Sequence, residues 1–296
     1  MKATSLTPLQ RLKIPPYWLL AIAAGLVAIY MTLSWKAGDE AQLGMSVLFW
    51  LAVGSLLWGK RHELNLDSEV LPSIVGALVI GFVLWYSASI SGLRLTNENV
   101  QRLAPLLRLL PFISAVGVAL LASGFKGFKQ YWQEVTILFF LGGPATIASF
   151  IPDISPITAI FSAFMLHYMG FQVYLYDKVF INLPDGGVKV YHGCSGMEAM
   201  TYVLGLSVIC LIMFPIARRK QYFVPLIALV VGFVVNSFRV ALMAVLANAQ
   251  NMEAFKYWHE GEGSLVFGMI SVMVFGVFYW LLLRLEDTSS PETEEA

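Results

Sequence analysis

Charge is scarce in this sequence. Only 13% of its 296 residues are charged, whereas 58% are hydrophobic. Soluble globular domains carry about 25% charged residues, so an ordinary soluble domain is excluded. Lysine plus arginine and aspartate plus glutamate number 19 each. The formal net charge is therefore zero, and the sequence shows no basic footprint for a nucleic acid.

Cysteine is equally scarce, and the common metal-binding patterns are missing. Cys194 and Cys210 lie on one predicted helix, roughly 24 Å apart, which is too far for a disulfide. Neither belongs to a Cys-x-x-Cys pair, so a zinc or redox motif is not supported. No second histidine follows His259-Glu260, so the paired histidines of a helical metalloprotease are absent. We therefore expect neither a metal nor a cofactor.

Long apolar runs make up most of the chain. Each has about 15 to 25 residues, the length that crosses a bilayer as a helix. The runs cover residues 17–35, 43–58, 70–90, 105–122, 133–150, 156–171, 197–214, 222–247 and 264–283. The sequence therefore predicts an all-α polytopic membrane protein.

Loop charge orients these runs across the membrane. The strongest basic cluster, Arg218-Arg219-Lys220, belongs in the cytoplasm by the positive-inside rule, and so does the basic N-terminus. If every run crossed, that cluster would lie on the wrong face. We therefore predict about eight transmembrane helices plus one re-entrant or interfacial helix, either 133–150 or 156–171. A Gly142-Gly143-Pro144 break in the first run and the joint at residues 151–156 between the two runs make one of them this candidate.

Two segments differ from the apolar runs. Residues 172–193 alternate apolar and polar side chains around a turn at Pro184-Asp185-Gly186-Gly187, which predicts a short extracytoplasmic β-hairpin. The acidic residues 286–296 predict a disordered cytoplasmic tail. We expect N-terminal transmembrane helices over 1–132, a catalytic membrane core over 133–285, and this tail over 286–296.

Three reactive side chains reach one membrane face in this topology. Cys194 is expected to start the helix after the hairpin, where a helix N-terminus favours the thiolate. His259 precedes the last span and can take the thiol proton, then protonate a leaving amine. Arg239 lies roughly 12 Å inside the outer end of its span, where an arginine is a functional hypothesis by default. It can bind an oxyanion or a substrate carboxylate.

Other polar residues are candidates to support these three. Asn236 shares a helix face with Arg239 and could orient its guanidinium or donate to the same oxygen. Glu198 could pair with Arg239 or bind a cationic substrate group, and His192 competes with His259 as the base. The plainer interpretation is that a lone cysteine or histidine packs, and that an intramembrane arginine only pairs with acids or carbonyls.

The order of these motifs resembles the exosortase/archaeosortase family, including its cyanobacterial branch, the cyanoexosortases. The resemblance covers roughly residues 134–284 and is carried by Gly193-Cys194-Ser195-Gly196, Asn236-Ser237-Phe238-Arg239 and Trp258-His259. It implies a multi-span cysteine protease or transpeptidase that cuts exported proteins near a C-terminal sorting signal. That signal is a short motif such as Pro-Glu-Pro, a transmembrane helix and a basic tail.

The resemblance also implies roles and a location. Cys194 would be the nucleophile, Arg239 the oxyanion or substrate partner, and His259 the acid/base, with Ser195 and Gly196 supporting the cysteine turn. The active site would face the periplasm from a bacterial inner membrane. The cleaved protein would pass to an acceptor such as a surface glycoconjugate.

A second hypothesis is a small-molecule or ion carrier whose site is formed by Arg239 and Glu198. Carriers often contain internal repeats, and no self-similarity between the halves is evident. Substrate uptake that depends on Arg239 but not on Cys194 would favour the carrier. A non-catalytic scaffold for partner membrane proteins also remains open.

Overall fold

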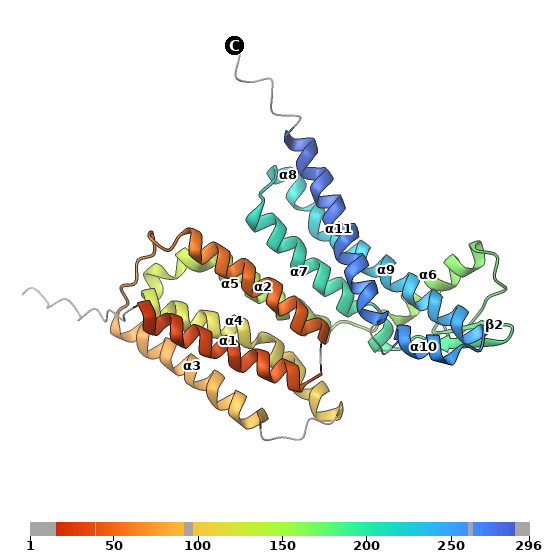
Figure 1. Ribbon diagram of the computed structural model, residues 1–296, viewed down its shortest axis with the longest axis horizontal. Helices are drawn as coiled ribbons and strands as arrows, with labels where there is room; N and C mark the ends of the chain where they lie inside the picture. The colour runs from red at the N-terminus through yellow and green to blue at the C-terminus, as the bar shows by residue number, and fades with distance from the viewer. Residues whose placement is uncertain (1–15, 39, 92–96, 260–262, 288–296) are drawn as a thin grey trace, which may run out of the picture. The chain divides into compact units, whose positions relative to one another are not determined.

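The computed structural model describes residues 16–38, 40–91, 97–259 and 263–287 (Figure 1). The chain divides into two compact units, Met1–Thr146 and Ile147–Ala296. Most of the described residues are helical, and the β-strands among them lie in the second unit. The division into an N-terminal membrane part over 1–132 and a catalytic core over 133–285 remains a prediction, because compactness does not define function.

The first unit is built from long apolar helices. These are α1 (Pro16–Lys36), α2 (Glu40–Gly59), α3 (Val70–Ser91), α4 (Asn97–Gly127), the 3₁₀ turn η1 (Phe128–Tyr131) and α5 (Trp132–Ala148). α3 and α4 pack closely where Gly76 meets Gly117, since a Cβ on Gly76 would lie 2.7 Å from the Gly117 carbonyl oxygen. Small residues let helix backbones approach in this way inside a bilayer.

The predicted break at Gly142-Gly143-Pro144 is wrong. α5 runs without interruption through all three residues. Gly142 lies against the main chain of Arg108 in α4, where any Cβ would collide. The glycine therefore serves a close helix–helix approach rather than the end of a helix.

The expectation of an all-α polytopic membrane protein is confirmed. Six segments of the described chain are long and apolar enough to cross a membrane, and one of them, Pro105–Ala148, contains α5 and the part of α4 that follows residue 104. α7 (Met197–Met213) is a shorter apolar helix. α6 (Ser155–Tyr168) has 14 residues, about 21 Å of helix, which is too short for a hydrocarbon core of about 30 Å. The number of crossings and their sidedness remain predictions.

The second unit is arranged around α9 (Phe223–Asn248). α6, α7 and strand β3 contact it, as do α10 (Met252–His259) and α11 (Gly263–Asp287). The short helix α8 (Arg218–Gln221) joins α7 to α9. α7 lies close to α9 because Gly232 has no side chain: a Cβ there would lie 2.7 Å from the Cα of Met200. Helix α9 is thus packed on several sides by the other elements of this unit.

A small antiparallel sheet precedes α7. Its strands are β1 (Tyr174–Tyr176), β2 (Phe180–Leu183) and β3 (Gly186–Lys189), in the order β1-β2-β3. Leu183 pairs with Gly186, so Pro184-Asp185 forms the two-residue turn of the predicted hairpin. β1 is an additional strand that the prediction missed.

The sheet is anchored on helices α6 and α9. Ile181 and Val190 are buried in a core with Leu166 of α6 and Ala244 of α9. Burial of an aliphatic side chain of this size contributes about 1.5–3 kcal/mol. The chain that leaves the sheet at Val190 therefore enters the next turn from a fixed position.

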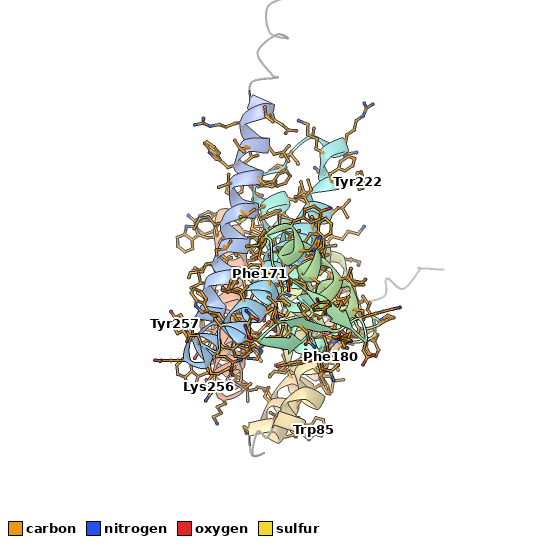
Figure 2. All side chains as sticks on the ribbon, turned by 90° about the vertical axis from the view of Figure 1, so that its right-hand side faces the viewer. Trp85, Phe171, Phe180, Tyr222, Lys256 and Tyr257 are labelled. Carbon is orange, nitrogen blue, oxygen red and sulfur yellow. The ribbon has the colours of Figure 1, made fainter. Side chains whose placement is uncertain are left out.

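The second unit has two distinct ends. Tyr222, next to the basic helix α8, lies at the end opposite to Phe180 and Tyr257 (Figure 2). The sheet and α10 therefore share one end, and the basic cluster lies at the other (Figure 1).

Candidate active site

Cys194 lies in a tight turn just before α7. The turn is a 3₁₀ helix, η2 (His192–Cys194), in which the Cys194 N–H donates to the Tyr191 carbonyl over 2.7 Å. Gly196 then adopts a left-handed φ of 89°, and α7 begins at Met197. The expectation that Cys194 starts the helix is therefore wrong, because the left-handed glycine separates the turn from the helix. The effect of the helix N-terminus on the thiol remains untested.

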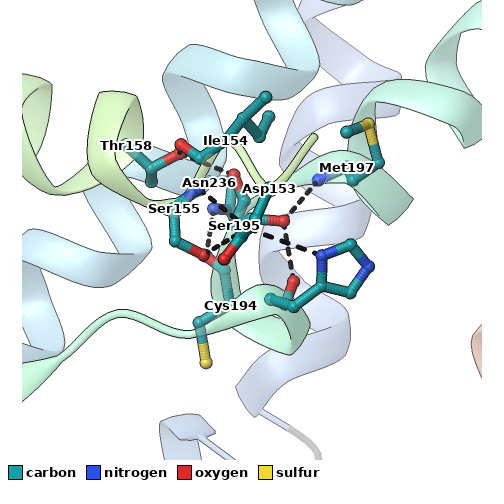
Figure 3. Close-up of polar contacts among 9 residues, drawn as sticks. Asp153, Ile154, Ser155, Thr158, Cys194, Ser195, Met197 and Asn236 are labelled. Carbon is teal, nitrogen blue, oxygen red and sulfur yellow. Dashed lines mark hydrogen bonds and ion pairs between the residues drawn. The ribbon is translucent and has the colours of Figure 1, made fainter. Parts of the chain in front are cut away.

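Two helices hold the main chain of this turn. The Asn236 amide on α9 donates to the Cys194 carbonyl over 2.9 Å, and the Thr158 hydroxyl on α6 donates to the Ser195 carbonyl over 2.6 Å. Thr158, Ser195 and Asn236 are buried. The Cys194 side chain points away from this polar cluster (Figure 3). Side chains from two elements thus fix consecutive carbonyls and leave the thiol outside the cluster.

Gly196 fits this arrangement for a second reason. A Cβ at position 196 would lie 2.7 Å from the Asn236 amide nitrogen and 3.0 Å from its Cβ. A side chain here would both strain the left-handed backbone and displace Asn236. The Ser195 hydroxyl completes the turn by donating to the His192 carbonyl over 2.7 Å. Ser195 and Gly196 therefore help to fix the geometry of the turn, and their part in catalysis stays a prediction.

The thiol of Cys194 faces an imidazole. Its Sγ lies 3.5 Å from Nε2 of His259, the last residue of α10. Both residues are half-buried. The Phe255 ring stacks on the imidazole with centroids 5.3 Å apart and planes 22° apart, which restricts the orientation of the imidazole. The neutral tautomer with its proton on Nδ1 would let Nε2 accept the thiol proton.

Arg239 holds the chain that carries this imidazole. One of its terminal nitrogens donates to the His259 carbonyl over 2.7 Å. Its buried Nε has no hydrogen-bond partner among the residues that the structure describes. A buried guanidinium N–H without a partner is costly unless a bound group satisfies it. The guanidinium therefore holds the main chain of His259, and its Nε keeps an unsatisfied donor among the described residues.

Asn236 has a partner that was not predicted. It was expected to orient the Arg239 guanidinium or to donate to the same substrate oxygen, and in the structure its amide donates to the Cys194 carbonyl. A contact with a substrate oxygen stays a prediction. Glu198 is exposed, and its carboxylate accepts from the Tyr202 hydroxyl over 3.0 Å. Both residues thus have structural contacts next to the cysteine turn.

His192 faces a carboxylate that sequence reasoning missed. Its Nδ1 lies 3.5 Å from Asp153, whose same oxygen accepts from the Ser155 amide over 3.0 Å and hydroxyl over 2.7 Å. Slight burial acts to raise the pKa of Asp153, but the Ser155 hydrogen bonds and His192 together lower it below its ordinary value. An aspartate two residues before a serine at a helix start is a known turn signal. It was available in the sequence.

These observations define a class: a polytopic helical membrane protein with a cysteine–histidine pair at one end of a helical unit. The family model of the transmembrane exosortases matches residues 35–276, so the chain belongs to the transmembrane exosortase family. This match begins well before residue 134 and includes α2, α3 and α4, which the resemblance had left out, whereas almost all of α1 precedes it. Searches of the curated proteins and of the solved structures found no match.

Proposed function

We propose that the chain is a membrane cysteine transpeptidase that cuts exported proteins at a C-terminal sorting signal. The observation that carries this proposal is the 3.5 Å separation of Cys194 Sγ and His259 Nε2 in a chain of the exosortase family. A thiol this close to an imidazole, in a turn fixed by two helices, has the arrangement that nucleophilic catalysis requires.

The first half-reaction forms a thioacyl intermediate. His259 takes the proton of the Cys194 thiol, and the sulfur attacks the peptide carbonyl to form a tetrahedral oxyanion. Arg239 binds that oxyanion or an adjacent substrate carboxylate through its guanidinium. The C–N bond then breaks, and the amine leaves with the proton from Nε2. The new carboxyl end of the exported protein remains on Cys194 as a thioester.

The second half-reaction transfers the exported protein. A nucleophile of the acceptor gives its proton to His259 and attacks the thioester carbonyl, and the thiolate leaves and is reprotonated. A surface glycoconjugate with a free hydroxyl or amine suits this step. Attack by water would make the enzyme a simple protease. His192 is the alternative base, and its contact with Asp153 supplies the carboxylate partner that orients a catalytic imidazole.

The membrane setting fits a substrate that is itself anchored in lipid. The proposed site lies at the end of the second unit opposite to the basic cluster 218–220. Basic loops favour the cytoplasm, so the site would face the periplasm from the inner membrane. A sorting signal with its own transmembrane helix would present its cleavage point at that depth.

The test is to trap the intermediate. The protein is expressed in a host that carries its exported substrates, and Cys194 peptides are analysed by mass spectrometry after rapid acid quench. We expect a thioester adduct on Cys194 and loss of processing in the Cys194→Ala variant. Cys210→Ala is the matched control, because Cys210 lies near the far end of α7 and outside the cysteine turn. Normal processing by Cys194→Ala would overturn the proposal.

A further inference from the structure

Tyr191 reaches the same imidazole nitrogen as the thiol. Its hydroxyl oxygen lies 3.5 Å from His259 Nε2, and the two rings meet edge to face with centroids 6.5 Å apart. Cys194 Sγ lies 3.5 Å from that nitrogen as well. The hydroxyl and the sulfur are therefore at most 7.0 Å apart, twice that distance.

The main chain on both sides of Tyr191 is fixed. Val190 is buried in the sheet core, and its N–H donates to the Val179 carbonyl over 2.8 Å. On the other side, the Tyr191 carbonyl accepts from the Cys194 N–H over 2.7 Å. Because side chains alternate along an extended segment, the burial of Val190 turns Tyr191 to the opposite face, where it is half exposed.

Gly193 leaves room for the Tyr191 ring. A Cβ at position 193 would lie 3.3 Å from the edge of that ring, tighter than an ordinary contact. The ring therefore lies along the turn that carries the nucleophile. The same turn therefore places the Tyr191 hydroxyl beside Nε2 of His259.

We infer that Tyr191 is a further catalytic residue, whose hydroxyl donates a hydrogen bond to the oxyanion formed on Cys194. This inference rests on the proposed function. The oxyanion lies two covalent bonds from the sulfur, so a donor several ångströms from that sulfur can reach it. A neutral tyrosine donor stabilises the charge and keeps its own proton. Catalytic hydrogen bonds are often long without substrate and shorten in the reacting complex.

The role is specific to one step. When sulfur attacks, the S–C bond forms and the carbonyl electron pair moves to oxygen, where Tyr191 and Arg239 supply donors. When the C–N bond breaks, the carbonyl re-forms and the amine takes the proton from His259. Tyr191 neither gains nor loses a proton over the cycle. A reaction of the thiol that forms no oxyanion should therefore not need Tyr191.

Two small reagents separate these possibilities without knowledge of the natural substrate. p-Nitrophenyl acetate acylates a thiol through a tetrahedral oxyanion, and its leaving group needs no proton. Iodoacetamide alkylates the same thiol at a saturated carbon, without an oxyanion. Both rates are measured on the full chain in detergent, and the rates of the Cys194→Ala variant are subtracted.

We expect Tyr191→Phe to slow acylation by roughly 100- to 1,000-fold, the usual effect of losing one oxyanion donor, and to leave alkylation unchanged. The ring that contacts His259 and Gly193 is kept in this variant. Tyr174→Phe, in the exposed strand β1, is the matched control and should change neither rate.

Equal acylation by wild type and Tyr191→Phe would overturn the inference and leave the proposed function in place. Slowing of both reactions would also overturn it, because Tyr191 would then act on the thiol or on His259. If the wild-type Cys194 reacts with neither reagent, the proposed function itself fails.

Discussion

The imidazole of His259 lies 3.5 Å from the Cys194 thiol, at the half-buried end of helix α10. Its ring is held by Phe255 on one side, and its carbonyl is held by Arg239. These contacts keep Nε2 directed at the sulfur before substrate binds. Phe255 and Arg239 therefore both act on the C-terminal part of α10, which carries the imidazole.

His259→Gln should slow acylation of Cys194 by p-nitrophenyl acetate roughly 100- to 10,000-fold, the range for a lost general base. Glutamine cannot take up a proton at neutral pH. The rate is measured by release of p-nitrophenolate from the purified chain. His167→Gln, at the exposed end of α6, serves as the control. An undiminished rate in His259→Gln would point to His192 as the base.

Asp153 links the start of α6 to the cysteine turn, and its contribution depends on pH. Its pKa is lowered from an ordinary value of 3.8, so the folded state favours the carboxylate. A lowered pKa stabilises the folded state above the ordinary value, and that stability is lost as the pH falls through the lower folded value. The group is largely exposed, so the effect is small.

Asp153→Asn should therefore be less stable than wild type at pH 6, with a difference that shrinks as the pH falls below about 4. The measurement is the midpoint of thermal unfolding across this pH range in one detergent. Asp177→Asn, in the exposed turn between β1 and β2, is the control. A difference that grows at acid pH would contradict the lowered pKa.

At the scale of secondary-structure elements, α6 holds the cysteine turn in place without being long enough to cross the membrane. Its Thr158 holds the Ser195 carbonyl, and its Ser162 hydroxyl donates to the Ser237 carbonyl of α9 over 2.9 Å. Both hydroxyls are buried, so each bond forms away from water. α6 thus joins the cysteine turn to the helix that carries Asn236 and Arg239.

Removal of the Thr158 hydroxyl tests this positioning role. Thr158→Val leaves a buried carbonyl without its donor, which costs about 1–3 kcal/mol, and a shift of the turn by about 1 Å can lower a rate roughly 100-fold. We expect a lower acylation rate in Thr158→Val and a rate close to wild type in Thr158→Ser. The unfolding midpoints show whether both variants fold. Equal acylation rates in folded Thr158→Val and Thr158→Ser variants would contradict the positioning role of Thr158.

At the scale of the whole molecule, the charge of the loops implies a direction across the membrane. The basic cluster 218–220 and the sheet lie at opposite ends of the second unit (Figure 1). Positive loops are retained in the cytoplasm. The sheet and the cysteine turn would therefore face outward.

Single-cysteine labelling can test that direction. In a background with Cys194→Ala and Cys210→Ala, cysteines are introduced at Lys178, in the turn between β1 and β2, and at Tyr222 beside α8; both positions are exposed. A membrane-impermeant maleimide should label Lys178→Cys in intact spheroplasts. It should label Tyr222→Cys only after the membrane is opened. The reverse pattern would place the proposed active site in the cytoplasm.

The sequence by itself determined which segments are apolar helices and the order of Cys194, Arg239 and His259 among them. Helix formation in a bilayer depends on local composition, and loop charge depends on a few residues, so both can be read along the chain. The hairpin turn at Pro184-Asp185 was predictable for the same reason, because turn chemistry is local.

Only the tertiary structure decided which side chains meet. Thr158, Asp153 and Tyr191 contact the cysteine turn or the imidazole across distances in sequence that no local pattern encodes. The contact of Asn236 with the Cys194 carbonyl was not foreseen for this reason, since a hydrogen bond depends on ångström-scale positions set by the packing of α6, α7 and α9. The close approach at Gly142 likewise became visible only when α4 and α5 were packed together.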